Sequence, residues 1–330
     1  MKDLPIIDLS QFRNGDAATR AAVAEKVDQA CRDIGFIVLT GHGIPKDVFD
    51  AGHRIAGEFF ALPLETKTQY ERVGESFYGY YQMESSALAY TLDAEDVSPD
   101  LREAFASNRP DIETGDPYFR SDAVKNLGYL IQYPQEVERF QETWTDTYYA
   151  LAELGRDIMS MFAAALKQPP DYFENLLARH ASNLAVFTYP PLKGPVKDGQ
   201  LRCGAHTDYG SLTIVHSDWS IPGGLQILSP SGEWIDAPNV ENSVVINIGD
   251  MMQRWTNDRW VSTMHRVGNP DDADPEATHR QSLVFFYNPD MEGLVEAIPS
   301  CVDADNPSKY KPIIVADHFL TKMGKMIEET

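Results

Sequence analysis

The sequence has few cysteines, few basic residues and no long apolar run. Its three cysteines, Cys31, Cys203 and Cys301, are far apart and form no Cys-x-x-Cys pair. This number and spacing argue against a disulfide framework and a thiolate zinc site, and they are typical of a reducing compartment. No segment reaches the apolar length that spans a bilayer, and the N-terminus lacks a signal-peptide pattern. We therefore expect a cytoplasmic protein with no membrane partner.

Positive charge is also scarce. Lys and Arg together number 28 against 50 Asp and Glu, which gives a formal net charge of −22. Such acidity argues against nucleic acid, anionic membrane surfaces and polyanionic substrates as partners. It does not exclude a small-molecule substrate, because a pocket responds to its local charge. The sequence does not fix the oligomeric state, and a monomer is compatible with it.

The first half of the chain has mainly helical patterns, and it contains no internal repeat or low-complexity tract. Apolar residues recur three and four positions apart in several segments, and prolines mark where some of these segments end. Residues 74–120 are rich in Gly, Ser, Pro and Tyr, so we expect a long, partly irregular region there. We expect strands at residues 4–9 and 35–39 and helices at residues 18–33, 45–61, 134–166 and 317–328.

From residue 183 onward the pattern changes to short β-rich runs. Gly, Pro, Asn and Asp separate these runs at regular intervals. Many short strands with turn signals predict an antiparallel sandwich or barrel. The expected fold class is therefore mainly β, a jelly roll flanked by helices, in one structural domain covering residues 1–330.

One motif in this β-rich half carries metal-binding chemistry. His206 and Asp208 are two residues apart, and His265 follows 57 residues after Asp208. In a strand, residues i and i+2 point to the same face, so an extended segment would project His206 and Asp208 together. Two histidines and one carboxylate bind mononuclear non-haem Fe(II) on one face and leave the other open. The alternative is a chance motif whose histidines are hydrogen-bonded core residues.

A second pair with the same spacing competes with the first. His216 and Asp218 lie ten residues further along and, on geometry alone, could serve equally well. Asp218 runs into a turn-like stretch, so we expect this pair at a strand end and His216 in a structural or pocket-wall position. The remaining histidines lack a carboxylate at matching spacing and are predicted to be non-ligands: His42, His53, His180, His279 and His318.

Across nearly its whole length the chain resembles the isopenicillin N synthase-like branch of the 2-oxoglutarate and Fe(II)-dependent oxygenases. The strongest match includes Asn247, Asp250 and the run from Ser262 to Val267, which contains His265. The resemblance also decides between the two His-x-Asp pairs in favour of His206 and Asp208. Further matching segments are residues 4–9, 35–37, 42–43, 59–63, 101–105, 189–191, 206–208 and 255–257.

The resemblance implies a double-stranded β-helix at about residues 180–300, preceded by the N-terminal region, residues 1–120, typical of the family. It implies that Fe(II) is bound by His206, Asp208 and His265. The family's Arg-x-Ser motif corresponds to Arg280 and Ser282, which hold the distal carboxylate of 2-oxoglutarate in members that use it. Tyr189 lies where the family often has a tyrosine in contact with cosubstrate or substrate. The implied cofactors are Fe(II), 2-oxoglutarate and O2.

The chain departs from many plant members at two positions of one predicted strand. Phe187 replaces a common Asn, and Ala185 replaces a commonly basic residue, so the substrates of plant members are not transferred to this chain. Asn247 and Asp250 are expected to have structural roles near the site, and the acidic residues 271–276 are expected to form a solvated loop. Candidate substrate-facing residues are Tyr78, Tyr80, Tyr81, Arg102, Phe187, Phe286 and Asn288, with ordinary packing as the alternative for the tyrosines.

The implied activity is an Fe(II)- and 2-oxoglutarate-dependent dioxygenase that hydroxylates or desaturates a small molecule and releases succinate and CO2. The alternative within the family is an Fe(II)-dependent oxidase that does not use 2-oxoglutarate and draws its electrons from the substrate. The Arg-x-Ser motif occurs in both groups and does not separate them. A third hypothesis is a jelly-roll binding protein without catalytic activity. The substrate, its site of oxidation and the pathway cannot be read from the sequence.

Overall fold

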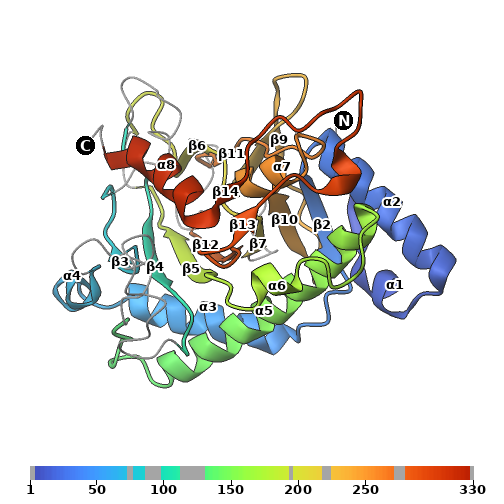
Figure 1. Ribbon diagram of the computed structural model, residues 1–330. Coiled ribbons are helices and arrows are strands. Elements are labelled where there is room, and N and C mark those ends of the chain that lie inside the picture. The colour runs from blue at the N-terminus through green and yellow to red at the C-terminus, as the bar shows by residue number, and fades with distance from the viewer. Residues whose placement is uncertain are drawn as a thin grey trace.

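Two β-sheets lie at the centre of the structure, and helices cover the outer face of the larger one (Figure 1). The computed structural model describes residues 4–72, 77–85, 98–111, 131–192, 196–217, 224–270 and 279–327. Within this part of the chain the sheet pairings are antiparallel, except for the parallel pair of the first two strands. This arrangement confirms the expected mainly β jelly roll with helical flanks.

The larger sheet has eight strands and the sheet opposite it has four. In spatial order the larger sheet contains β1 (Ile6–Asp8), β2 (Phe36–Thr40), β10 (Val244–Ile248), β7 (Leu212–Ser217), β12 (Arg280–Tyr287), β5 (Asn183–Tyr189), β4 (Glu103–Ser107) and β3 (Gly79–Tyr81). The smaller sheet contains β6 (Cys203–His206), β11 (His265–Val267), β8 (Leu225–Leu228) and β9 (Trp234–Asp236), while β13 (Leu294–Val295) pairs with β14 (Ile313–Ile314).

The two faces of the larger sheet differ in chemistry because side chains alternate along each strand. On β12, Leu283 and Phe285 are almost fully buried in the main hydrophobic core. Ser282 and Val284, which alternate with them, face a cavity between the sheets. The outer face therefore packs the core, and the inner face is available for binding.

Helices α3 (Lys46–Phe60) and α5 (Phe140–Ala165) run beneath the outer face in Figure 1, and both contact β12. α2 (Ala17–Asp33) begins after Asp16, whose carboxylate accepts a hydrogen bond from the Thr19 N–H and so caps the helix. No described helix is both long enough and apolar enough to cross a membrane. The other helices are α1 (Leu9–Asn14), α4 (Leu64–Lys67), α6 (Glu174–Leu177), α7 (Asp250–Trp255) and α8 (Val315–Ile327).

The predicted helices are present, but the long one starts later than expected. α5 begins at Phe140 rather than at residue 134. Arg139, just before it, has a left-handed backbone with φ of 59°, which a continuous helix cannot contain. The prediction for residues 134–139 was therefore wrong, because apolar spacing does not reveal this backbone reversal. Most of the predicted irregular region, residues 74–120, lies outside the described residues, although it contributes β3 and β4.

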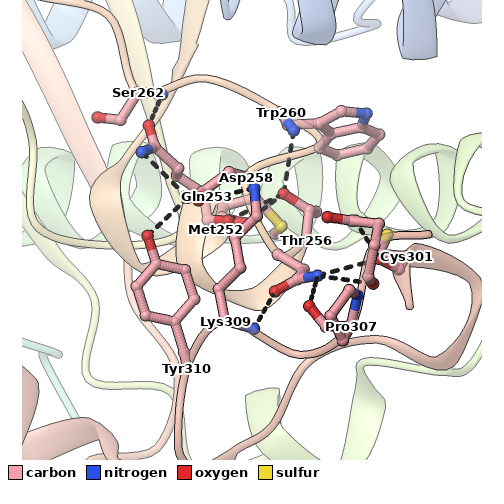
Figure 2. A network of polar contacts seen from close by, with 12 residues as sticks. Met252, Gln253, Thr256, Asp258, Trp260, Ser262, Cys301, Pro307, Lys309 and Tyr310 are labelled. Carbon is pink, nitrogen blue, oxygen red and sulfur yellow. Dashed lines mark hydrogen bonds and ion pairs between the residues drawn. The ribbon is translucent and has the colours of Figure 1, made fainter. Parts of the chain in front are cut away.

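β11 begins only at His265, and the four residues before it, 261–264, form no strand. Before it, Asn257 and Asp258 adopt left-handed backbone angles, with φ of 53° and 60°. A network of polar contacts joins this segment to residues 301–310 and to Gln253 of α7 (Figure 2). Gln253 Oε1, for example, accepts a hydrogen bond from the Ser262 N–H at 2.6 Å. The network holds the backbone in a compact path that delivers His265 to the sheet edge.

Asn257 is the centre of this network and is fully buried. Its Nδ2 donates to the carbonyl oxygens of Cys301 at 3.3 Å and Pro307 at 3.2 Å. Its Oδ1 accepts from the Lys309 N–H at 2.8 Å. Removal of the amide would leave these backbone groups without that partner, and an unsatisfied buried polar group is costly.

We expect Asn257→Ala to lower the free energy of unfolding by about 2–3 kcal/mol, because several buried hydrogen bonds are lost together. Chemical denaturation measures the change. Asn242→Ala is the matched control, since Asn242 also has a left-handed φ, of 54°, but is exposed. An equal loss in both variants would show that backbone conformation, and not the network, accounts for the effect.

Candidate metal centre

The predicted metal-binding residues lie together at one end of the smaller sheet. His206 is the last residue of β6, and it is the register partner of His265, the first residue of β11. Asp208 follows in the next turn. The potential ligand atoms of these three residues all lie within 4.8 Å of one another, and among the described residues they form the one such group. Two histidines and a carboxylate in this arrangement fit a divalent iron with open positions.

The route by which Asp208 reaches this site differs from the expectation. β6 ends at His206, so Asp208 does not lie on the same strand. A turn carries it there instead, and the Asp208 carbonyl accepts a hydrogen bond from the Asp250 N–H at 2.7 Å. The start of α7 thus fixes the turn, which agrees with a structural role for Asp250. The predicted residues form this cluster, and Asp208 reaches it from just beyond the end of β6.

Hydrogen bonds orient both imidazole rings. His206 Nδ1 lies 2.8 Å from the Gly204 carbonyl, and His265 Nδ1 lies 3.2 Å from the Thr263 carbonyl. A carbonyl can only accept, so each Nδ1 carries the proton and each Nε2 has its lone pair available. Asp208 Oδ1 lies 3.9 Å from the Nε2 atom of each histidine. Three donor atoms therefore converge on one position.

The second carboxylate oxygen of Asp208 is held by two side chains. Asp208 Oδ2 accepts from Thr213 Oγ1 at 2.5 Å and from Asn247 Nδ2 at 2.7 Å. Thr213 lies on β7 and Asn247 on β10, and both strands belong to the larger sheet. The larger sheet therefore holds the carboxylate, whereas the two histidines belong to the smaller sheet. Such outer contacts set ligand orientation and commonly affect metal affinity. Asn247 therefore has the expected structural role, which it fulfils through a direct hydrogen bond to the carboxylate of Asp208.

The electrostatic environment keeps two of the three groups in the form that binds metal. Burial alone would raise the pKa of Asp208. His265, His206 and the hydrogen bonds from Asn247 and Thr213 outweigh burial and lower this pKa below its ordinary value. Burial, followed by the neighbouring His206, lowers the pKa of His265 to about 4. At neutral pH Asp208 is thus ionised and His265 neutral, as metal binding requires.

A cavity of about 330 Å³ between the sheets connects these residues with the predicted cosubstrate residues. Arg280 and Tyr189 are register partners on β12 and β5, and both line the cavity together with Ser282. Arg280 Nη2 donates to Ser217 Oγ at 2.9 Å, and Ser217 Oγ lies 2.9 Å from Ser282 Oγ. The structure therefore brings all six predicted site residues to one cavity.

Most of the candidate substrate-facing residues also line this cavity, and one does not. Tyr80 belongs to the main core, and its hydroxyl donates to Glu103, so the alternative of ordinary packing holds for this tyrosine. Alternation along β3 separates it from Tyr81, whereas Tyr78 precedes the strand. The candidates on the cavity wall are Tyr78, Tyr81, Arg102, Phe187, Phe286 and Asn288.

His216, the histidine of the competing pair, is directed elsewhere. His216 lies on the outer face of β7, where its ring stacks on Phe49 with centroids 3.8 Å apart. Its Nδ1 is 2.9 Å from Nε2 of His53, which confirms a structural position for His216. Asp218 and the acidic residues 271–276 lie outside the described residues. Among the described residues, none of the five histidines predicted to be non-ligands belongs to the metal cluster.

The sequence did not single out four residues that complete the site. Thr213 and Ser217 could have been found from alternation along β7, since they share the face of Val215. Met291 and Phe319 also line the cavity, but they come from the C-terminal segment. Phe319 reaches it because α8 docks beside the metal cluster, with His318 Nε2 3.1 Å from the Tyr209 carbonyl and Lys322 Nζ 2.5 Å from Asp250 Oδ2. No local sequence signal reveals that docking.

Two family models match the chain. One, described as the N-terminal part of the non-haem dioxygenase in morphine synthesis, matches residues 4–136, and the 2OG-Fe(II) oxygenase superfamily model matches residues 173–289. The 2-oxoglutarate-Fe(II) type oxidoreductase hxnY of Emericella nidulans is 33% identical over 95% of this chain and 87% of its own length. The chain belongs to the 2-oxoglutarate/Fe(II) oxygenase superfamily.

Other members of the superfamily also match this chain over nearly its whole length. Validamycin A dioxygenase of Streptomyces hygroscopicus subsp. limoneus is 31% identical over 99% of this chain and 87% of its own length. A full-length Neurospora crassa protein, solved in complex with alpha-KG, has a TM-score of 0.82 at 30% identity, and the match covers 97% of this chain and 96% of that one. The protein is a non-haem Fe(II), 2-oxoglutarate-dependent dioxygenase that uses O2, and its recognition from motifs is confirmed.

We expect Thr213→Val to weaken Fe(II) binding about 10- to 100-fold, because Asp208 loses one of the two donors that orient it. Anaerobic titration with Fe(II) measures the dissociation constant. Thr188→Val is the matched control, since Thr188 is a buried strand threonine whose hydroxyl contacts His279 instead. Unchanged affinity in Thr213→Val would contradict the role of this hydrogen bond.

Proposed function

We propose that His206, Asp208 and His265 bind Fe(II), and that Arg280, Ser282 and Tyr189 bind 2-oxoglutarate. With both bound, the enzyme oxidises a small organic molecule, by hydroxylation or desaturation, and releases succinate and CO2. The observation that carries this proposal is the single cavity that contains the His-Asp-His cluster and the Arg-x-Ser pair. Iron and a dicarboxylate would thus meet within one cavity.

The chemistry of Arg280 suits the distal carboxylate of the cosubstrate. Its guanidinium is buried, at 5% exposure, and its N–H donors form a planar fork that can bind a carboxylate at two points. Ser217 fixes one terminal nitrogen, and Ser282 is connected to the same hydroxyl. The side chain is therefore positioned before any ligand arrives, which lowers the entropic cost of binding.

Bound Fe(II) and 2-oxoglutarate supply the activation of O2, coupled to the decarboxylation of 2-oxoglutarate. The residues of this chain supply orientation and exclusion of water. Val215, Val284 and Leu225 line the cavity beside the polar groups and make that space largely apolar. An apolar enclosure strengthens electrostatic contacts and limits side reactions with water.

The relatives favour 2-oxoglutarate use over the oxidase alternative. The Emericella nidulans relative is a 2-oxoglutarate-Fe(II) type oxidoreductase, and the Neurospora crassa protein was solved with alpha-KG. Their substrates differ at similar identity, since Validamycin A dioxygenase and the Arabidopsis thaliana homoarginine-6-hydroxylase are both 31% identical to this chain. From the relatives we therefore infer the cosubstrate of this chain, but no particular substrate.

We also propose that residues 1–330 form one catalytic domain. Strands from residues 6–107 and from residues 183–287 join the same eight-stranded sheet, so the N-terminal region extends the jelly roll. A reducing cytoplasmic location stays a prediction from the cysteine content.

We expect Asp208→Ala to abolish succinate formation while the fold stays intact, because the cavity then lacks the anionic metal ligand. Succinate is measured with saturating Fe(II) and 2-oxoglutarate, and circular dichroism checks the fold. Asp236→Ala, at an exposed carboxylate of β9, serves as the control. Full activity of Asp208→Ala at ordinary iron concentrations would rule out the ligand assignment.

We expect Arg280→Ala to raise the KM for 2-oxoglutarate about 10- to 100-fold, because a charge-assisted double hydrogen bond is lost. Arg280→Lys should give an intermediate value, since the charge remains without the planar fork. Steady-state kinetics with varied 2-oxoglutarate provides the comparison. An unchanged requirement would support the oxidase alternative, in which the motif binds the substrate's own carboxylate.

A further inference from the structure

A second buried arginine, Arg102, lies in the wall of the same cavity. It immediately precedes β4 and is 8% exposed. Glu103 is the register partner of Thr188, so Arg102 lies opposite Tyr189, which in turn pairs with Arg280. Arg102, Tyr189 and Arg280 therefore form one row across three neighbouring strands. The 2-oxoglutarate site as proposed uses only the last two.

Three contacts hold the Arg102 side chain in place, and one of them is a hydrogen bond to the Tyr189 side chain. One terminal nitrogen lies 3.2 Å from Asp100 Oδ2, and the other oxygen of that carboxylate accepts a hydrogen bond from the Gly204 N–H at 2.8 Å. The guanidinium carbon lies 4.3 Å from the centroid of the Phe187 ring. A guanidinium has five N–H donors, so the contacts with Asp100 and Tyr189 leave capacity for a second planar acceptor. Asp100 thus orients Arg102 without saturating it.

Apart from Asp100, the described residues around Arg102 hold no opposite charge. The cavity wall that continues from it along β4 and β5 includes the small apolar residues Ala104, Ala106 and Ala185. A buried ion pair adds little stability relative to apolar residues of similar size, so the fold alone does not require Arg102. Among the described residues of the cavity wall, Asp208 is the one carboxylate, and it faces the metal position. The described wall therefore favours an anion over a cation.

We propose that Arg102 binds a carboxylate of the organic substrate, which makes the substrate a small carboxylic acid. Its apolar body would lie along the recess formed by Ala104, Ala106 and Ala185. Ala106 and Ala185 are register partners, and Tyr78 packs against both. This inference rests on the proposed function, in which Arg280 takes the carboxylate of 2-oxoglutarate. The two arginines then separate two acids within one cavity.

Matched acids and amides test this assignment. The probes are 3-phenylpropanoate and hexanoate, each compared with its primary amide. They are titrated anaerobically into the wild-type protein loaded with Fe(II) and 2-oxoglutarate, and the change in its visible absorption band reports binding. We expect each acid to bind at least about tenfold more tightly than its amide, because a charge-assisted hydrogen-bond pair is formed. Arg102→Gln should remove that preference, and it should leave the affinity for 2-oxoglutarate unchanged because the Gln amide can still donate a hydrogen bond to Tyr189.

Asp100→Asn distinguishes binding from a structural role. If Arg102 binds the acid, this variant keeps or increases the acid preference, because a competing carboxylate is removed. Equal losses in Asp100→Asn and Arg102→Gln would overturn the proposal and assign the pair to the fold. Weaker 2-oxoglutarate binding in Arg102→Gln would also overturn it, since Arg102 would then belong to the cosubstrate site. So would a wild-type protein that binds the amides as well as the acids, or binds neither. Absence of the 2-oxoglutarate band itself would instead contradict the proposed function.

Discussion

The antiparallel register between β6 and β11 sets His206 opposite His265, and the rest of the site is arranged around that pair. The register shifts between His265 and Val267, so the smaller sheet is irregular next to the histidines. Asp208 completes the cluster only because a turn, held by α7, folds back towards the pair. The larger sheet then supplies the donors that fix this carboxylate, Thr213 and Asn247. Both sheets must therefore pack correctly before three donor atoms converge.

The same packing places the residues that stabilise the fold on one face of the larger sheet and the residues that bind ligands on the other. Alternation along β5, β7 and β12 sends one set of side chains to the helices and the other set to the cavity. The outer set is mainly apolar, and its members Leu283 and Phe285 are almost fully buried. The inner set contains Arg280, Ser282 and Thr213, which would be costly in a core without partners. The larger sheet therefore carries the ligand-binding side chains on its inner face and packs against the apolar core on its outer face.

Much of this could be predicted from the sequence because it depends on local periodicity. Short alternating runs indicated the strands, and the His-x-Asp spacing suggested metal ligands. The family resemblance then selected His206 and Asp208 over the competing pair and supplied Arg280 and Ser282, and these residues share one cavity. The departures arise where distant segments decide the backbone. Asn257 holds a compact turn through contacts with residues 301–309, so β11 is shorter than its apolar pattern suggests. Phe319 enters the cavity through the docking of α8, and Tyr80 points to the core through the pairing of β3 with β4. These features require tertiary contacts that no single segment encodes.

The central claim is that one cavity binds Fe(II) and 2-oxoglutarate together, with the iron at the His-Asp-His cluster and the distal carboxylate at Arg280. The most direct measurement is an anaerobic titration of the Fe(II)-loaded protein with 2-oxoglutarate, followed by visible absorption. The account predicts a saturable charge-transfer band, since chelation by the keto and carboxylate oxygens requires two open positions on the metal. No band, with iron still bound, would contradict the account and indicate an oxidase that does not use 2-oxoglutarate.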